Sequence, residues 1–363
     1  MMGLEHGFSG SYDPTDVTFL LKPVRMAFVD VAEKEAQIQS GLRHYSEMLA
    51  PENAPNAKYF DAFRAAFEAN RGRVGRDVAR LAKTLALRDG NETVLVSLAR
   101  AGTPVGVLLK RTLAALGRKA VHYSVSIIRD RGIDLVAMKA ILGRHSATNV
   151  VFVDGWTGKG AIAKELARAV FNDFPELVGA PVCVLSDLAG VADIAAGDED
   201  YVIPSAILNG VVSGLVSRTV LNAEVIGPGD FHGCVVLHHL VGMDLSRSYV
   251  DGQMEDVLAC LEAAEPALWG VEERSRATAV SSAFVDGMLA KTGTKQRNRI
   301  KPGIGEATRA LLRRMPEWLF VRDPVAGDVR HLMSLAAERG VAVESDPSLA
   351  YGACAVITTL GDA

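Results

Sequence analysis

The stretch NVVFVDGWTGKGAIA, residues 149–163, decides the fold of this protein. Four apolar residues run into Asp154, a short turn follows, and a Thr-Gly-Lys-Gly sequence opens an amphipathic segment. This order predicts a buried strand, a tight loop and the open N-terminus of a helix. Glycines allow close backbone approach, and free amides at the positive end of a helix dipole attract phosphate. We therefore expect a phosphate cradle made of Thr157, Gly158, Lys159, Gly160 and Ala161.

The segments on either side of the cradle show the same alternation of strand and helix patterns. Apolar runs expected to be strands alternate with segments of helical spacing: 93–98, 104–116, 121–128, 135–142, 149–153, 161–171 and 181–185. This alternation predicts an α/β fold with a doubly wound, mostly parallel sheet that binds its ligand at the carboxyl ends of the strands. Asp154 lies at such an end, where it is placed to accept sugar hydroxyls. Further strands are expected near 201–204 and 234–240, followed by a helix at 254–264.

The charge is distributed unevenly along the chain. The 363 residues carry a net charge of -4, yet residues 291–314 contain eight Lys or Arg and one Glu. Such a strip is typical of a surface that binds a phosphate backbone, and a solvated linker helix is the alternative. We expect a helical N-terminal region at 1–90, an α/β domain at 91–285, a basic linker at 286–298, and a small α/β domain at 299–363. Within the first region, helical spacing covers 31–49, 58–70 and 77–87.

The composition excludes several protein classes. With 49% apolar and 23% charged residues, the chain is neither disordered nor fibrous. Its four cysteines form no CxxC pair, which argues against a disulfide framework and a zinc site. The N-terminus has no signal-peptide pattern, and no apolar run is long enough to span a membrane. We expect a cytoplasmic protein with no membrane partner.

The sequence of the cradle matches neither of two common nucleotide-binding motifs. Gly155 and Gly158 are too close for a Walker A loop, and the stretch lacks the G-x-G-x-x-G fingerprint. It resembles the phosphoribosyltransferase signature, although Gly155 stands where that family has a second acid and Gly160 where it has a Thr. An ordinary strand-to-helix turn is the alternative.

That resemblance implies further site residues. It implies binding of phosphoribosyl pyrophosphate with Mg²⁺ carried by the donor, a pyrophosphate loop at Arg100, Ala101 and Gly102, and a mobile loop around 122–134. Arg129 and Arg131 of that loop would act with Asp154 in catalysis, unless they only pair with Asp130 and Asp134. Polar residues after later strands are candidates for holding a nitrogenous acceptor: Asp187, Ser205 and Asn209.

A narrower resemblance covers most of residues 3–285. Segments 8–12, 44–48, 99–104, 129–132 and 153–160 resemble the StiP family, a bacterial family of stress-response and tellurite-resistance gene clusters. That family is described both as phosphoribosyltransferase-like and as a cysteine protease. For a protease, the best nucleophile is Cys234 with His232. On a strand, His238 would lie about 13 Å from Cys234, too far for a hydrogen bond. A buried structural cysteine, or a metal beside His232 or His238, is the alternative; no direct metal site is expected.

The last 65 residues resemble RNA-binding domains of the pelota and L7Ae-like kind. Residues 299–314 match the opening turn and helix, which would read RNA through Lys301, Gly303, Gly305, Glu306, Arg309 and Arg313. The Asn of the family's turn is absent, so backbone attraction is expected to dominate base readout. A packing domain with a basic rim is the alternative.

Together these patterns predict a phosphoribosyltransferase-like enzyme that transfers ribose phosphate to a nitrogenous acceptor, with RNA as a further partner. A non-catalytic nucleotide- or RNA-binding stress protein and a cysteine protease remain alternatives. A homodimer is also expected.

Overall fold

A computed structural model describes residues 2–52 and 54–358. Its centre is a six-stranded sheet in the order β1-β4-β3-β7-β9-β11, in which every neighbouring pair is parallel. The strands are β1 (Thr18–Leu20), β3 (Thr93–Leu98), β4 (Ala120–Val125), β7 (Val150–Val153), β9 (Val182–Val184) and β11 (Ile194–Ala195). The expected α/β class and parallel sheet are confirmed; the comparison with a phosphoribosyltransferase fold stays a resemblance.

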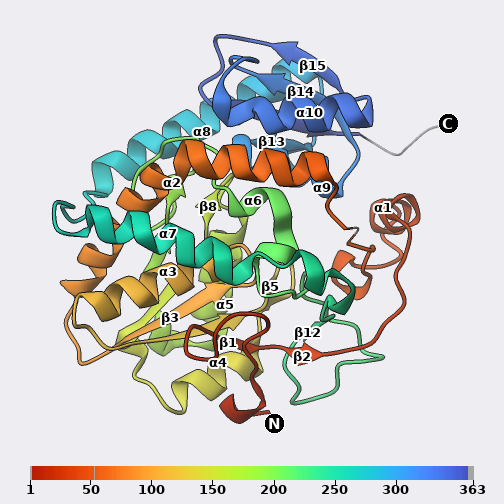
Figure 1. Cartoon of the computed structure of the whole chain (residues 1–363). Coiled ribbons are helices and arrows are strands. Elements are labelled where there is room, and N and C mark those ends of the chain that lie inside the picture. Colours follow the sequence, from red (N-terminus) through yellow and green to blue (C-terminus); the bar gives the residue numbers. More distant parts are fainter. Residues whose placement is uncertain (1, 53, 359–363) are drawn as a thin grey trace.

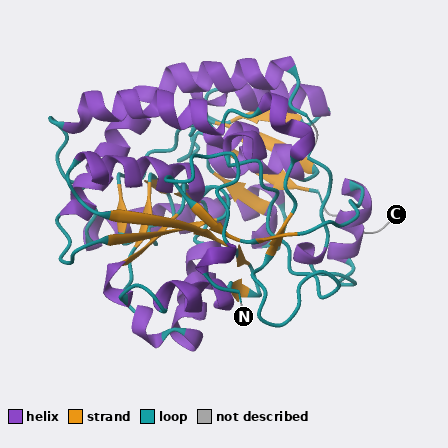
Figure 2. Cartoon of the chain, turned by 60° about the horizontal axis from the view of Figure 1, so that its bottom comes forward, coloured by secondary structure: helices purple, strands orange, loops and turns teal. Residues whose placement is uncertain are grey.

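Helices cover both faces of this sheet (Figure 2). Leu95 points into a core shared with α2 (Ala57–Ala86), α3 (Gly102–Ala115) and α7 (Ser246–Leu261). Its neighbours Val94 and Val96 point into a second core with α4 (Leu135–Leu142) and α5 (Ala161–Asp173). Alternate residues of a strand face opposite sides, so an unbroken apolar strand requires exactly such a two-sided cover.

The N-terminal region belongs to this body and is not a separate unit. β1 pairs with β4 in the main sheet. The two helices expected at 58–70 and 77–87 are one helix, α2, which packs along α7. Gly75 permits this close packing, because a Cβ there would lie 2.8 Å from backbone and side-chain atoms of Asp256. α1 (Val31–Gln39) is shorter than expected.

Two strand predictions after the main sheet are wrong. Residues 201–204 form no strand, and the apolar run at 234–240 contributes only β12 (Gly233–Cys234), which pairs with β2 (Lys22–Pro23). His238 begins a short 3-10 helix, η6 (His238–Met243). The remaining short elements are η1 (Leu4–His6), η2 (Tyr45–Glu47), β5 (Ile127–Ile128), β6 (Gly132–Ile133), η3 (Ala147–Asn149), β8 (Trp156–Thr157), η4 (Pro175–Leu177), β10 (Ser186–Asp187), α6 (Ser205–Leu208) and η5 (Asn209–Val212).

The C-terminal unit has its own sheet, in the order β13-β16-β14-β15, at the top of Figure 1. α8 (Val271–Thr292) runs through the start of the expected linker, and η7 (Arg297–Arg299) follows. The unit then contains β13 (Ile300–Pro302), α9 (Ile304–Arg313), β14 (Pro316–Val321), η8 (Gly327–Val329), α10 (Arg330–Arg339), β15 (Ala342–Ser345) and β16 (Ala353–Ile357). The helix expected at the opening of this unit, within 299–314, is present as α9.

The C-terminal unit packs on the carboxyl ends of the body's strands. Asp200 of the body accepts hydrogen bonds from the backbone N–H groups of Ile304 (2.8 Å) and Gly352 (2.8 Å). The Tyr351 hydroxyl donates to the carbonyl oxygen of Leu188 (3.0 Å). The basic strip is therefore part of an interface between the two units, and only partly a solvated surface.

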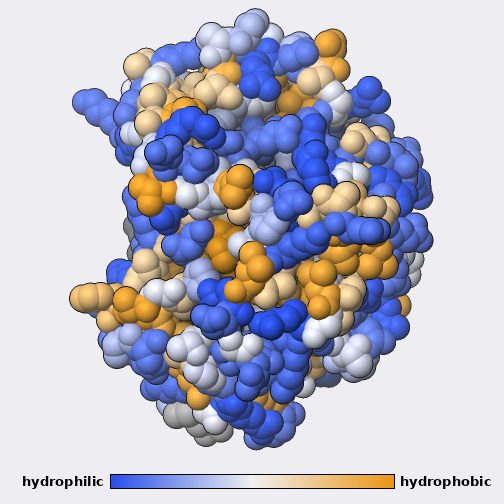
Figure 3. All heavy atoms as spheres, turned by 90° about the vertical axis from the view of Figure 1, so that its left-hand side faces the viewer, coloured by the Kyte–Doolittle hydropathy of each residue, from blue (hydrophilic) through white to orange (hydrophobic). Residues whose placement is uncertain are grey.

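The outer surface gives few further clues. The face in Figure 3 is mostly hydrophilic, with small groups of hydrophobic side chains. None of the helices described at 2–52 and 54–358 is long and apolar enough to cross a membrane.

Candidate anion-binding site

The cradle has the expected backbone shape. β7 ends at Val153, and α5 begins at Ala161 directly after Gly160, whose φ of +70° lies in the left-handed region. A residue with a Cβ is strained at that angle, so glycine suits this position. No side chain caps the N-terminus of α5. Its first amides are therefore left for a ligand or water.

Two of the predicted site residues, Thr157 and Asp187, hold the cradle in place. The Thr157 hydroxyl donates to Asp187 Oδ1 (2.5 Å) and accepts from the backbone N–H of Ala189 (3.0 Å). Asp187 is fully buried and also accepts from the backbone N–H of Ala192 (2.7 Å). The Thr157 hydroxyl is thus already engaged, and Asp187 holds the loop in place from within the protein.

Asp154 sits at the carboxyl end of β7, where the sequence places it. One carboxylate oxygen accepts from the backbone N–H of Gly155 (2.8 Å). Burial raises the pKa of Asp154 to about 6; the backbone hydrogen bond and Arg309 oppose this rise, and Glu306 adds to it. The carboxylate is therefore mostly ionised at neutral pH but close to its titration point.

Lysines crowd the cradle from both units. Burial, together with the nearby charges of Lys301 and Arg129, lowers the pKa of Lys159 to about 7, and the charge of Glu306 opposes this shift. Burial likewise lowers the pKa of Lys301 to about 8. Lys159 Nζ also donates to the carbonyl oxygen of Arg297. An anion entering here would favour the protonated lysines, which is the electrostatic behaviour expected of a phosphate site.

Helix α9 lies directly on the cradle. A Cβ on Gly158 would be 2.5 Å from Cγ of Glu306, and one on Gly305 would be 2.6 Å from Cε2 of Trp156. Burial alone would raise the pKa of Glu306, but Arg309, Lys301 and Lys159 hold it below its usual value. A carboxylate from the C-terminal unit thus lies among the cations of the cradle.

The six candidates for RNA contact consequently face the body to a large extent. Gly303 has a φ of +85° and lies against Leu188 and Asp200. Arg309 pairs with Glu306 (3.0 Å) and lies 5.8 Å from the centroid of the Trp156 ring, and Arg313 donates to Asn209. In the arrangement seen here α9 covers the cradle, and the RNA contacts expected of these six residues stay a prediction.

The pyrophosphate-loop candidates lie next to the cradle, between β3 and α3. A Cβ on Gly102 would be 2.3 Å from the carbonyl oxygen of Val153, so glycine lets α3 begin against β7. Ala101 precedes α3 without a side-chain cap. Arg100 is buried, pairs with Glu52 Oε1 (2.5 Å) and donates to the carbonyl oxygen of Val216.

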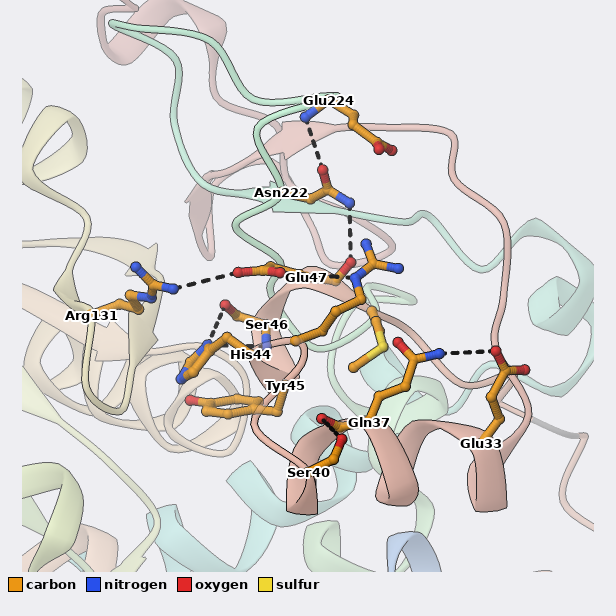
Figure 4. A network of polar contacts seen from close by, with 12 residues as sticks. Glu33, Gln37, Ser40, His44, Tyr45, Ser46, Glu47, Arg131, Asn222 and Glu224 are labelled. Atoms are coloured by element: carbon orange, nitrogen blue, oxygen red, sulfur yellow. Dashed lines mark hydrogen bonds and ion pairs between the residues drawn. The ribbon is translucent and has the colours of Figure 1, made fainter.

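The loop candidates Arg129 and Arg131 are exposed and tied to the segment before α2. The backbone N–H of Arg129 donates to the Tyr45 hydroxyl (2.7 Å), and Arg131 pairs with Glu47 (3.4 Å; Figure 4). Arg129 also pairs with Asp130 (3.4 Å), as the ion-pair alternative expects. Asp134 instead caps α4 through the backbone N–H groups of Val136 and Ala137.

The remaining acceptor candidates have different partners. Ser205 is hydrogen-bonded to Tyr249, while Asn209 accepts from Arg313. Asp187, Ser205 and Asn209 are thus not joined in one polar network. Asn209 alone lies beside cationic groups.

The thiol of Cys234 lacks the surroundings of a nucleophile. It is fully buried, and burial raises its pKa to about 12. His232 Nδ1 is hydrogen-bonded to the Ser126 hydroxyl (2.9 Å), and its backbone N–H donates to Asp134. A catalytic cysteine needs a lowered pKa or an adjacent base. Neither accompanies Cys234 in this arrangement.

The donor set does not favour a resident metal. Across residues 2–52 and 54–358, no group of three or more His, Cys, Asp or Glu side chains is placed to hold a metal ion. At the cradle Asp154 contributes a single carboxylate, because the residue after it is Gly155. A Mg²⁺ ion there would have to arrive on the oxygens of a phosphorylated ligand.

Two cations near the site carry no sequence signal. Lys34 and Arg218 come from unrelated segments, yet the charge of Arg313 lowers the pKa of Lys34 and the charge of Arg100 lowers that of Arg218. Periodicity and motifs reveal only local order. Such a long-range convergence requires the folded chain.

Comparison with known proteins places the chain in a family. Residues 10–254 match the family model described as tellurite-like stress resistance cysteine protease StiP. The chain belongs to the StiP family. A StiP relative from Acinetobacter baylyi, described as cysteine protease StiP, is 41% identical over 370 residues, covering 99% of this chain and 96% of the relative. Residues 279–359 match the PELOTA RNA binding domain, a match that begins within α8.

Both resemblances inferred from sequence, to the StiP family and to the pelota domain, are thereby confirmed. The name shared by the StiP model and the relative describes a cysteine protease, and it favours that alternative over a phosphoribosyltransferase. Asp154, Lys159 and Cys234 all lie within the matched StiP range.

Proposed function

We propose that the protein is an enzyme that binds a phosphorylated ribose in the cradle, with phosphoribosyl pyrophosphate or a related nucleotide as its substrate. The observation that carries this proposal is the uncapped N-terminus of α5 facing Lys159 and Lys301, two lysines whose pKa values are lowered to about 7 and about 8. Such sites gain stability when a phosphate supplies the missing negative charge.

In the proposed reaction, a nitrogen of the acceptor forms a bond to C1′ of the ribose while the bond from C1′ to the pyrophosphate oxygen breaks. Pyrophosphate leaves with the electron pair, and the acceptor's proton passes to water. The amides of α5 and Lys159 hold the 5′-phosphate, and Asp154 accepts hydrogen bonds from the ribose hydroxyls. Electrostatic positioning is the main contribution that the protein makes to such a displacement.

Calorimetry with phosphoribosyl pyrophosphate and Mg²⁺ tests the proposal. We expect binding by the full chain and a loss of at least about tenfold in Lys159→Met, the scale of one charged hydrogen bond. Lys164→Met is the matched control, because Lys164 is exposed on the same helix. No binding by the unaltered chain, or equal binding by Lys159→Met, would exclude the transferase.

A cysteine protease is the second candidate, and the names of the family and of the Acinetobacter relative favour it. With Cys234 as nucleophile, activity requires a rearrangement that exposes the thiol and lowers its pKa, because both are unfavourable here. Cleavage of a casein substrate that disappears in Cys234→Ala and survives in Cys260→Ala would support the protease. Cleavage that survives both changes points to another group.

RNA binding by the C-terminal unit is the third element of the proposal, and the PELOTA match supports it. Since α9 faces the body, RNA would meet the outer side of the unit, where Trp318 is 37% exposed beside Phe320. Aromatic stacking and basic side chains are typical of RNA contacts. Fluorescence anisotropy should show salt-sensitive RNA binding that weakens in Trp318→Ala; unchanged affinity would contradict this placement.

A further inference from the structure

A second group of cations lies beside the cradle and is shared by both units. We call it the arginine cluster: Lys34, Arg100, Arg218, Arg313 and Arg314. Its carboxylates are Glu35 and Glu52. Five basic side chains thus face two acidic ones, which leaves an excess of positive charge in a partly buried place.

Contacts around η5 bring the cluster together. Asn209 accepts from Arg313, and the next residue, Gly210, has no room for a Cβ, which would lie 3.0 Å from Arg100 Nη1 and 3.1 Å from Glu52 Oε2. Arg100 donates to the carbonyl oxygen of Val216, two residues before Arg218. Arg100, Arg218 and Arg313 therefore approach one another from the loop after β3, from the segment after η5 and from the end of α9.

The third side of the cluster comes from α1, which meets the residue after α9 through an ion pair. Glu35 on α1 pairs with Arg314 (2.7 Å), and its neighbour Lys34 has its pKa lowered to about 7 by burial and by Arg218. Arg218 is held by the carbonyl oxygens of Tyr45 and Met48.

Two donors in the cluster are buried without a hydrogen bond in the described structure: Nε of Arg100, and Nε of Arg314, which lies 2.7 Å from Glu35 Oε1 in an ion pair. The Arg100 side chain is 5% exposed. Burial and the charges of Arg100 and Arg309 lower the pKa of Arg313 well below its usual value. An orphaned guanidinium donor and mutual repulsion are both relieved by an anion with several acceptor oxygens. Glu52 and Arg314 reach the surface at the edge of the cluster, with side chains 24% and 37% exposed.

We propose that the arginine cluster binds an oligophosphate, and that Arg313 of the C-terminal unit completes the site. Guanidinium groups suit this ligand because their donors form paired hydrogen bonds with phosphate oxygens. The site is therefore complete only while α9 is docked. This inference does not depend on phosphate binding in the cradle.

Titration of the full chain with sodium pyrophosphate tests the inference, with binding followed by calorimetry and by thermal shift. We expect submillimolar binding that falls about 10- to 100-fold in Arg313→Gln, the range for one charged, paired hydrogen bond. Arg313→Lys keeps the charge without the fork and should bind with intermediate affinity. Arg25→Gln and Arg330→Gln, at exposed positions of the body and the C-terminal unit, should bind like the unaltered chain.

A thermal readout separates ligand binding from a merely structural role. Because Arg313 is repelled by its neighbours, ligand-free Arg313→Gln should melt no lower than the unaltered chain, while the stabilisation by pyrophosphate disappears. No binding by the unaltered chain, or equal binding by Arg313→Gln, overturns the inference. So does an equal loss in both controls.

Two further measurements identify the source of the anion and distinguish binding at the cluster from binding in the cradle. If pyrophosphate binds as tightly as ATP, the ligand of the cluster is a free oligophosphate. If ATP binds more tightly than pyrophosphate, the ligand is a nucleotide. Both results agree with the inference. Lys159→Met should abolish binding of ribose 5-phosphate but leave pyrophosphate at the cluster. Failure of the first measurement alone removes the cradle proposal and leaves this one standing.

Discussion

The phosphate binding proposed for the cradle should depend strongly on pH, because the pKa of Lys159 is lowered to about 7. Because that pKa is lowered to about 7, the lysine is half protonated at pH 7 and about 1% protonated at pH 9. If only the charged lysine holds a phosphate, affinity falls about 50-fold over this interval, or about 2.3 kcal/mol. Lys301, with a pKa of about 8, adds about a tenfold decline.

Ribose 5-phosphate is the suitable probe, since its second pKa near 6 leaves it almost fully dianionic from pH 7 to pH 9. Calorimetry at constant ionic strength gives the affinity at each pH. At pH 8 about 0.9 of Lys159 is neutral, so binding should take up about 0.9 proton through this residue, seen as a dependence on the ionisation enthalpy of the buffer.

Two variants make this prediction specific. Lys159→Arg keeps its charge over the whole range, so only the roughly tenfold decline due to Lys301 should remain. Lys164→Arg, an exposed change on α5, should keep the full decline. Affinity that is constant between pH 7 and pH 9, or a full decline that persists in Lys159→Arg, would refute the reasoning.

Three other predictions concern the interface and the thiols. Glu306→Gln removes the carboxylate that lies among the cradle's cations, so affinity for ribose 5-phosphate should rise about 5- to 30-fold by calorimetry, whereas exposed Glu272→Gln should have no effect. Asp200→Ala leaves two backbone N–H groups without their acceptor and should lower the free energy of urea unfolding by about 1–3 kcal/mol; an unchanged midpoint contradicts this. Burial raises the pKa of Asp200 to about 6, so this group stabilises the folded chain at low pH. As the pH rises from about 4 through 6, the free energy of unfolding should fall by up to about 3 kcal/mol because of Asp200, and the Asp200→Ala variant should not show this fall. In the folded chain at pH 7.5, iodoacetamide should modify partly exposed Cys260 and spare Cys183, Cys234 and Cys354, whose pKa values are raised to about 12; rapid labelling of Cys234 by mass spectrometry would instead favour the protease.

Local pattern was a good guide to the elements and a poor guide to their ends. The helix predicted at 135–142 coincides with α4, because Asp134 caps it and its apolar spacing is regular. The prediction failed where tertiary packing extends or shortens an element. α2 continues through Gly72 and Gly75 because α7 supports it, and the strand expected at 234–240 stops after Cys234.

By itself, the sequence determined the parallel α/β body, the strand, loop and helix that form the cradle at 157–161, and a C-terminal unit of pelota type. Each of these depends on residues that are neighbours in the chain, so hydrophobic period, glycine placement and charge reveal them. The tertiary structure alone decided that α9 covers the cradle, that Glu306 lies among its cations, and that arginines from positions 100, 218 and 313 meet. Contacts between such distant residues depend on how two finished units pack together, and no local pattern carries that information.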